Sequence, residues 1–322
     1  MIIALSGGVG GAKLALGLSR VMPAEDLLVV VNTGDDFEHL GLSISPDIDT
    51  VAYTLAGLAN RELGWGRHDE TWSFMATMEA LGGQTWFRLG DRDMALHIER
   101  TRRLKAGETL SAVTADLCRR MGVGPAVVPM TDDPVRTRLL TDLGWLDFQE
   151  YFVHRRCEPV VSQLQFQGAG AARPHPAFIA ALADPALEAV VICPSNPFIS
   201  VEPILAIPGV RDALIGCNAP IIAVSPIIAG RAVKGPTAKM MTELGLDPSA
   251  GTVAQRYAEL LDGYVIDHAD MAEVVSIDAK VTLARTLMTT LEDREALARI
   301  VLDAAKVLRR RELRGLRHSG LR

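Results

Sequence analysis

Short, continuous runs of apolar residues recur along the chain and predict strands that are buried on both faces of a sheet. The runs are rich in valine and isoleucine and do not alternate with polar residues, which favours parallel strands over a sheet with one wet face. They cover residues 2–5, 27–33, 125–130, 189–195, 219–226 and 263–267.

Helical patterns, in which apolar residues lie three or four positions apart, separate most of these runs. Because strands alternate with helices, we predict an α/β fold with a Rossmann-like, mostly parallel sheet flanked by helices. The helical patterns cover residues 12–22, 50–63, 111–122, 252–262 and 290–311.

The middle of the chain has a different pattern, in which apolar and polar side chains alternate as they do in antiparallel strands. We expect a meander there, on the edge of the main sheet or beside it, followed by a short helix. The whole of residues 1–322 would then form one continuous α/β domain with an inserted meander and helical subdomain at about 131–185. Two separate domains are the alternative. The alternating segments are 135–142, 144–155 and 160–169, and the short helix is 175–185.

Composition narrows the class of protein. The 322 residues are 48% hydrophobic and 22% charged, which is ordinary for a globular protein. The net charge of -6 disfavours a nucleic-acid-binding surface. No apolar stretch approaches the roughly 20 residues that span a bilayer, and the four cysteines form no CxxC pair. We therefore expect a cytoplasmic protein with reduced thiols and with no nucleic-acid or membrane partner.

The first predicted strand leads directly into the glycine-rich sequence SGGVGGAK. This is not a Walker A loop, because Leu14 rather than serine or threonine follows Lys13. It is not a full dinucleotide fingerprint either, because Lys13 stands where the third glycine belongs. Gly8, Gly10 and Gly11 still let backbone N–H groups approach an anion at a helix N-terminus. We predict that these glycines and Lys13 bind a phosphate; a tight turn without a ligand is the alternative.

Four carboxylates follow the second predicted strand within fifteen residues. Asp35 and Asp36 lie just past the strand, and Asp47 and Asp49 stand at a proline turn before the next helix. Such a concentration of like charge is costly unless a divalent cation or an acid–base role offsets it. A capping role at the helix N-terminus is the alternative for Asp49.

Candidate anion-binding residues occur in other loops. The segment WFRLGDRDMALH carries Arg88 and Arg92, which are candidates for holding a phosphate or carboxylate unless the segment is only a solvated helix start. The loop MTDDPVRT follows the third strand. The loop PSNPFIS, with Ser195 and Asn196, follows the fourth.

The loop SPIIAGRAVKGPTAKMM follows the fifth strand and carries Arg231, Lys234 and Lys239 among glycines and a proline. Three cations in such a loop favour an anion cradle over a bare solvated loop. Ligands of open α/β sheets bind outside the carboxyl ends of the strands. The loops together therefore predict a site for a phosphorylated ligand with a metal, and no Ser-His-Asp or Cys-His order indicates covalent catalysis.

The motifs SGGVGGAK, NTGDD, SPDIDT, LGDRD, PSNPFIS and SPIIAGRAVKGPTAK resemble, in this order and spacing, those of the 2-phospho-L-lactate transferase family. The resemblance extends from about residue 1 to residue 310. Each motif alone is weak, and the combination in order is specific. A related uridine-diphosphate-linked family of uncertain function shares the glycine-rich start, but DIDT and LGDRD favour the transferase.

The resemblance implies a transferase of coenzyme F-420 biosynthesis. A phospholactyl-type group would pass from a guanosine diphosphate-linked donor to the ribityl hydroxyl of the deazaflavin Fo, and GMP would leave. Members of the family differ in whether the group derives from phospholactate, phosphoenolpyruvate or phosphoglycerate. They use Mg²⁺ and are often dimers, so we expect Mg²⁺ as the cofactor and a homodimer.

The resemblance also implies roles for individual residues. Asp49 and Arg88 match positions that bind Fo, and Asp35 and Asp49 match metal positions. The glycine loop and the loop of Ser195 and Asn196 match the donor side.

Phosphoryl transfer depends mainly on positioning and on charge stabilisation. We therefore expect the glycine loop, Arg231 and Lys234 to bind the donor diphosphate. One aspartate, Asp49 or Asp36, would orient or deprotonate the attacking hydroxyl.

Two other classes of function stay open at this point. A nicotinamide-dependent oxidoreductase would use an acidic residue such as Asp35 or Asp36 after the second strand, but Lys13 in place of the third glycine disfavours it. A non-catalytic nucleotide-binding regulator related to the same fold has no evident need for the DIDT and GDRD motifs.

Overall fold

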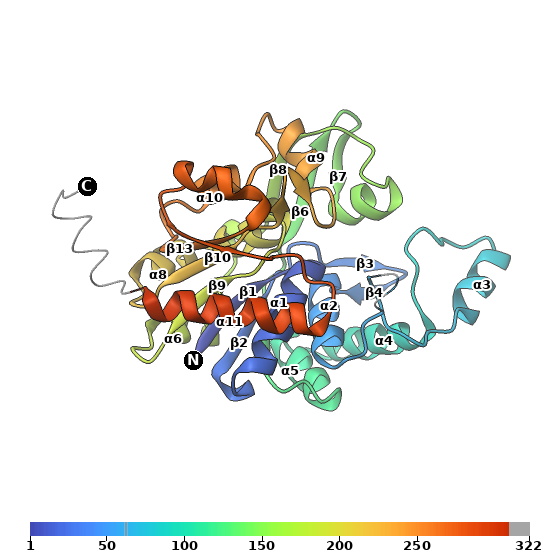
Figure 1. Cartoon of the computed structure of the whole chain (residues 1–322). Coiled ribbons are helices and arrows are strands. Elements are labelled where there is room, and N and C mark those ends of the chain that lie inside the picture. The colour runs from blue at the N-terminus through green and yellow to red at the C-terminus, as the bar shows by residue number, and fades with distance from the viewer. Residues whose placement is uncertain (61, 63, 309–322) are drawn as a thin grey trace.

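The protein is built around a parallel sheet of seven strands (Figure 1). The computed structural model describes residues 1–60, 62 and 64–308. The strand order is β14-β13-β10-β9-β1-β2-β5, and neighbouring strands are parallel throughout. The strands are β1 (Ile2–Ser6), β2 (Leu27–Val31), β5 (Ala126–Pro129), β9 (Ala189–Ile192), β10 (Ile221–Val224), β13 (Gly263–Asp267) and β14 (Lys280–Ala284).

Each continuous apolar run of the sequence forms a strand of this sheet, which confirms the Rossmann-like α/β fold. The hydrophobic pattern missed β14. This strand lies at the edge of the sheet, and only Ala284 among its residues is buried. An edge strand of this kind has no continuous apolar run for the pattern to detect.

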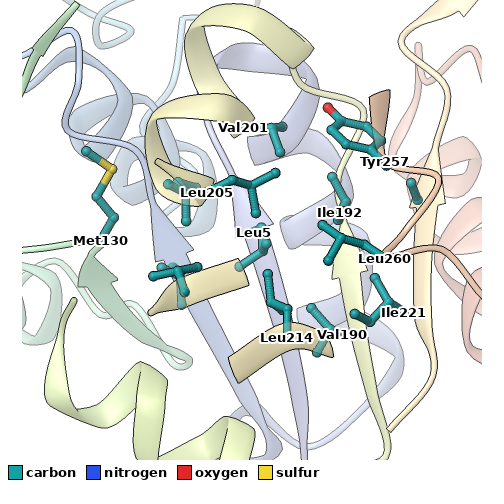
Figure 2. Close-up of a cluster of buried hydrophobic side chains, with 14 of the residues drawn as sticks. Leu5, Met130, Val190, Ile192, Val201, Leu205, Leu214, Ile221, Tyr257 and Leu260 are labelled. Atoms are coloured by element: carbon teal, nitrogen blue, oxygen red, sulfur yellow. The ribbon is translucent and has the colours of Figure 1, made fainter. Parts of the chain in front are cut away.

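Helices cover both faces of the sheet, because successive residues of a strand point to opposite sides. In β1, Ile3 and Leu5 face one hydrophobic core, whereas Ile2 and Ala4 face the other. Figure 2 shows Leu5 beside Leu205 in the first of these cores. Helices α6 (Pro176–Ala183), α7 (Glu202–Leu205), α8 (Val210–Gly216) and α10 (Ala250–Arg256) cover this side, and α1 (Gly8–Val21), α2 (Pro46–Leu55), α5 (Leu110–Arg120) and α11 (Leu291–Val307) cover the opposite side.

The predicted helices are present with shifted ends. Helix α2 begins earlier than predicted because Ser45 and Pro46 form its N-terminus. Helix α11 begins with a capping box between Thr290 and Asp293. The predicted helical residues 61, 63 and 309–311 lie outside the described residues. The sequence pattern did not predict α7 and α8, nor α3 (Ser73–Ala80), α4 (Asp91–Lys105) and α9 (Thr237–Glu243). Short 3-10 or π-helical segments occur at Ala24–Asp26, Glu150–His154, Ala169–Ala171 and Pro197–Val201, and a longer, kinked 3-10 segment spans His268–Ser276.

The chain between β5 and β9 forms a separate antiparallel sheet of three strands in the order β7-β6-β8. The predicted antiparallel strands are therefore present, beside the main sheet and not on its edge. They do not form a meander, because β8 pairs with β6 and not with β7. Residues 148–155 are not part of a strand, because Phe148 and Tyr151 are buried three positions apart and a π-helical turn follows β7. The strands are β6 (Arg136–Thr141), β7 (Gly144–Asp147) and β8 (Val161–Gln167), and two hairpins add β3 (Phe37–His39) with β4 (Leu42–Ile44) and β11 (Ile227–Ile228) with β12 (Arg231–Ala232).

The strand order reverses between β1 and β9. The chain passes from β1 to β2 and β5 on one side, and then returns to β9 on the other side of β1. Connections therefore leave β1 and β9 in opposite directions, which is the topological switch point where open α/β sheets bind ligands. Among the described residues, no helix is long and apolar enough to cross a bilayer.

Candidate active site

The loops that follow β1 and β9 are joined at the switch point by Ser195. The Ser195 hydroxyl accepts a hydrogen bond from the Gly7 N–H at 3.1 Å and donates one to the Gly7 carbonyl at 2.8 Å. The loops approach so closely that a β-carbon at Gly10 would overlap the Pro194 carbonyl oxygen and one at Gly11 would overlap the Ser195 hydroxyl. Gly8 has a φ of +61°, a conformation that favours glycine. The glycines are thus required by the packing of the loop, and phosphate binding by Gly8, Gly10 and Gly11 stays a prediction.

Asp47 occupies the N-terminus of helix α1. Its Oδ1 accepts a hydrogen bond from the Gly8 N–H at 2.6 Å. The Asn32 side-chain amide donates to Asp47 Oδ2 at 2.9 Å and to Asp35 Oδ1 at 2.8 Å, so that it bridges the two carboxylates. One amide group therefore holds Asp35 and Asp47 close together, an arrangement that the sequence alone did not predict.

Three buried carboxylates meet at this end of the sheet, and their ionised forms are disfavoured. Burial raises the pKa of the Asp36 carboxyl to about 7 and that of Asp47 to about 6. The pKa of Asp35 rises well above its ordinary value, first because of burial and then because Asp47 and Asp36 repel its charge. A bound cation would reverse this penalty.

Several buried polar atoms next to these carboxylates have no hydrogen-bond partner among the described residues. Asp36 accepts a bond from the Ser45 hydroxyl at 2.8 Å through Oδ2, but its Oδ1 has no partner. Buried polar atoms are almost always paired with protein or water, so an unpaired cluster indicates a place for a ligand or solvent. The other unpaired atoms of this cluster are Ser6 Oγ, Thr33 Oγ1 and Thr137 Oγ1.

Asp49 belongs to a second buried network, centred on helix α4. Both of its carboxylate oxygens accept hydrogen bonds from the Arg100 guanidinium, and the Arg100 Nη1 bond is 3.0 Å long. His97 lies between two carboxylates, with Nδ1 3.6 Å from Asp49 and Nε2 3.3 Å from Asp93. The Tyr53 hydroxyl donates to Asp93 at 2.5 Å. Ser45, and not Asp49, is the N-cap of α2, so the capping alternative for Asp49 is wrong.

The structure does not join Asp35 and Asp49, the two predicted metal ligands, in one cluster. Within residues 1–60, 62 and 64–308, it contains no group of three or more His, Cys, Asp or Glu side chains that could hold a metal ion. Mg²⁺ is often bound by only one or two carboxylates together with substrate phosphates. Asp35 with Asp47 is the pair of carboxylates that fits this requirement best, because Arg100 occupies Asp49. The metal role of Asp49 stays a prediction.

Arg88 lies on a different part of the surface, in the loop before α4. Its guanidinium is exposed and stacks over the Trp72 ring at 4.4 Å. A small pocket beside Trp72 is also lined by Trp65, Arg67 and Glu70. Arg92 is exposed at the start of α4, as the solvated-helix interpretation predicts.

The predicted donor-side cations come from separate elements. Lys13 donates to the Met288 carbonyl at 2.7 Å, and its pKa is lowered by burial and then by the charges of Arg294 and Lys234. Lys13 and Lys234 are therefore near each other, as a shared anion site requires. Arg231 is exposed on β12. Asn196 accepts a bond from the Phe198 N–H at 2.9 Å and caps the turn after β9.

Sequence reasoning missed Asn32, Arg100 and His97. Asn32 stands in the NTGDD motif, but its bridging role depends on Asp47, which lies in the next motif. Asp93, His97 and Arg100 lie four and then three positions apart on one face of α4. That spacing of polar residues on a helix was the signal that could have identified the network.

Comparisons with known proteins agree with the motifs. Residues 2–304 match the family model described as 2-phospho-L-lactate transferase CofD. A phosphoenolpyruvate transferase of Kitasatospora aureofaciens is 41% identical over 96% of this chain and 98% of its own length. One from Streptomyces coelicolor is 39% identical over 94% and 96%. A 2-phospho-L-lactate transferase of Methanosarcina mazei is 37% identical over 94% and 100%.

A solved structure supports the fold. A Bacillus halodurans protein described as a member of the upf0052 family superposes with a TM-score of 0.63, covering 94% of this chain and 98% of that one. The two sequences are only 12% identical, so the likeness concerns the fold alone.

Proposed function

This chain belongs to the 2-phospho-L-lactate transferase family, and we propose that its donor carries a phosphoenolpyruvyl group. It is a transferase of coenzyme F-420 biosynthesis that moves a phospholactyl or phosphoenolpyruvyl group to the deazaflavin Fo. The observation that carries this function is the family match over nearly the whole chain, at identities close to 40%. The relatives named phosphoenolpyruvate transferase at 39% and 41% identity support the choice of donor.

In the proposed reaction, the ribityl hydroxyl of Fo attacks the phosphorus that bears the three-carbon acid. A new phosphorus–oxygen bond forms, the bond to the oxygen of GMP breaks, and the hydroxyl proton passes to an aspartate. Of the two candidate aspartates, Asp36 suits this step better than Asp49. One oxygen of Asp36 has no partner among the described residues, whereas Arg100 binds both oxygens of Asp49. Asp49 would then position groups of the site together with Arg100.

The donor diphosphate would lie at the switch point. Lys13 and Lys234 supply positive charge there, and the loop that Ser195 ties to Gly7 supplies backbone N–H groups. Arg88, with the aromatic side chain of Trp72, would contact Fo. Preorganised donors of this kind stabilise the charge that develops on the leaving group.

A magnesium ion fits the residues at the site. Asp35 and Asp47 offer buried oxygen ligands whose mutual repulsion a divalent cation would offset. When bound, Mg²⁺ would neutralise charge on the donor diphosphate and the departing GMP. A homodimer is likewise a proposal, which light scattering of the purified protein tests.

The experiment for the donor is a direct comparison. Purified protein would be mixed with Fo, Mg²⁺ and each of three guanosine diphosphate-linked donors, built on phosphoenolpyruvate, 2-phospholactate and 3-phosphoglycerate. Mass spectrometry identifies the deazaflavin product, and initial rates give kcat/KM for each donor. We expect the highest kcat/KM with phosphoenolpyruvate. A higher value with either other donor would refute the choice of acyl group, and no product with any donor would favour the nucleotide-binding regulator.

A further inference from the structure

The inserted sheet contacts the acidic loop after β2 through the first residues of β6. The Thr137 N–H donates to the Gly34 carbonyl at 2.5 Å, and the Gln149 side-chain amide reaches the Asp35 carbonyl at 3.4 Å. A β-carbon at Gly34 would lie 2.9 Å from Thr137 Oγ1, so the two segments are in close contact. The sequence MTDDPVRT, which leads from β5 into β6, therefore passes directly beside Asp35 and Asp36.

Arg136, the arginine of this motif, is exposed, and within the part of the chain that the structure describes it forms no ion pair with a carboxylate. Its Nη1 donates to the carbonyl of its neighbour Val135 at 2.7 Å, and no carboxylate among the described residues lies within 4.0 Å of its guanidinium. A guanidinium has five N–H donors, so most of its capacity is free for a ligand. Its charge nevertheless acts on the site, because it opposes the rise in the pKa of both Asp36 and Asp35.

Arg138 shows what the ordinary arrangement on this strand looks like. It lies two positions further along β6, on the same side of the strand, and pairs with Asp147 on β7 at 3.1 Å. The same type of side chain on the same strand is thus neutralised at position 138 and not at position 136. The difference indicates that the charge of Arg136 serves a group that is not part of the chain.

The donor supplies such a group. Phosphoenolpyruvate, phospholactate and phosphoglycerate each carry a carboxylate next to the phosphate that is transferred. A carboxylate that enters a site already lined by Asp35, Asp36 and Asp47 requires a cation beside it. The planar fork of an arginine matches a carboxylate through two parallel hydrogen bonds. Lys13 and Lys234, which come from α1 and the loop after β12, are left for the diphosphate.

We propose that Arg136 binds the carboxylate of the donor's three-carbon acid and so selects donors that carry one. The proposal rests on the proposed function, because it takes its ligand from that reaction. Two other roles for Arg136 make different predictions. It would weaken binding of every phosphate ligand if it held the diphosphate, and it would alter the Mg²⁺ requirement if it were only a counter-charge for Asp35 and Asp36.

The test uses the full-length protein and three variants, Arg136→Gln, Arg136→Lys and the matched control Arg138→Gln. Each is compared with the wild type for the KM of the donor, the KM of Fo and inhibition by GMP. A charge-assisted hydrogen bond contributes about 1.5–3 kcal/mol, which corresponds to roughly a 10- to 150-fold change in binding. We expect Arg136→Gln to raise the donor KM by about 10- to 100-fold while the KM of Fo and the Ki of GMP stay unchanged. Arg136→Lys should recover part of the loss, and Arg138→Gln should resemble the wild type.

A donor analogue in which a vinyl group replaces the carboxyvinyl group makes the test specific. The wild type should lose about as much kcat/KM with this analogue as Arg136→Gln loses with the true donor. The variant itself should hardly distinguish the two donors. The proposal would be overturned if the substitution and the loss of the donor carboxylate lowered kcat/KM independently and additively. It would also be overturned if Arg136→Gln raised the Ki of GMP as much as the donor KM, or if it changed only the dependence of the rate on Mg²⁺. Failure of the wild type to turn over any donor would instead refute the proposed function, and circular dichroism checks that each variant is folded.

Discussion

Replacing Arg100 by methionine should destabilise the protein, because the buried carboxylate of Asp49 would lose its positively charged partner. Arg100 and Asp49 are 2% and 6% exposed, and the guanidinium binds both carboxylate oxygens. Methionine keeps much of the apolar volume but leaves Asp49 buried without its cation. Removing one partner of a buried ion pair typically costs about 3–5 kcal/mol. At about 2–4 °C per kcal/mol for chains of this size class, the melting temperature should fall on the order of 10 °C.

A double variant distinguishes the energy of the Arg100–Asp49 ion pair from the effects of each side chain on its other neighbours. If the cost arises from an unpaired buried charge, Arg100→Met combined with Asp49→Asn should be more stable than Arg100→Met alone, because no charge is then left uncompensated. The assay is urea unfolding followed by circular dichroism for the wild type, both single variants and the double variant, read as a double-mutant cycle. Arg102→Met is the control on the same helix, since Arg102 forms only an exposed pair with Glu99 and should not change the midpoint. Additive effects of the two single variants would refute this reasoning.

Three further predictions concern the site. Arg88→Ala should raise the KM of Fo several-fold and leave the donor KM unchanged, with Arg92→Ala as an inert control; the reverse pattern in steady-state kinetics would place Arg88 on the donor side. Gly11→Ala should destabilise the fold and lower activity, because the added β-carbon would overlap Ser6 Oγ and the Ser195 hydroxyl. A variant that keeps the wild-type melting temperature and activity would contradict this. Asp36 has a pKa of about 7 in the folded chain, above its unfolded value, so the folded state binds more protons. Without metal, stability should rise as the pH falls from about 7 towards 4, and Asp36→Asn should flatten this slope in urea unfolding measured across that range.

The main sheet could be predicted from the sequence because its strands are buried on both faces. Runs such as LLVVV and AVVI have few alternatives to a central parallel strand. Strand β14 escaped detection because polar residues interrupt its apolar residues and only Ala284 is fully buried. The turn at Glu150–His154 was mistaken for a strand, because buried Phe148 and Tyr151 at a spacing of three interrupt an otherwise alternating segment.

The acidic cluster illustrates what local patterns cannot supply. The concentration of aspartates after β2 was visible in the sequence, and the structure places Asp35, Asp36 and Asp47 together at the switch point. Which aspartate pairs with which partner depends on contacts between distant segments. Asp49 differs from Asp47 by two positions on α2, yet it faces Arg100 on another helix while Asp47 faces the glycine loop.

The cations show the same dependence on tertiary structure. Nothing in the local sequence distinguishes Arg136 from Arg138. Only the pairing of β6 with β7 gives Arg138 its acidic partner. Lys13 and Lys234 lie far apart in the chain and come close only because loops from different strands meet at one end of the sheet.

The central claim is that Fo is the acceptor of the transferred group, and the release of GMP tests it most directly. Protein, Mg²⁺ and the phosphoenolpyruvate-derived donor would be incubated with and without Fo, and GMP and the deazaflavin product would be quantified by liquid chromatography. A transferase predicts one GMP for each product molecule and almost none without Fo. GMP release at the same rate without Fo would reveal hydrolysis of the donor, and no release under either condition would contradict the account.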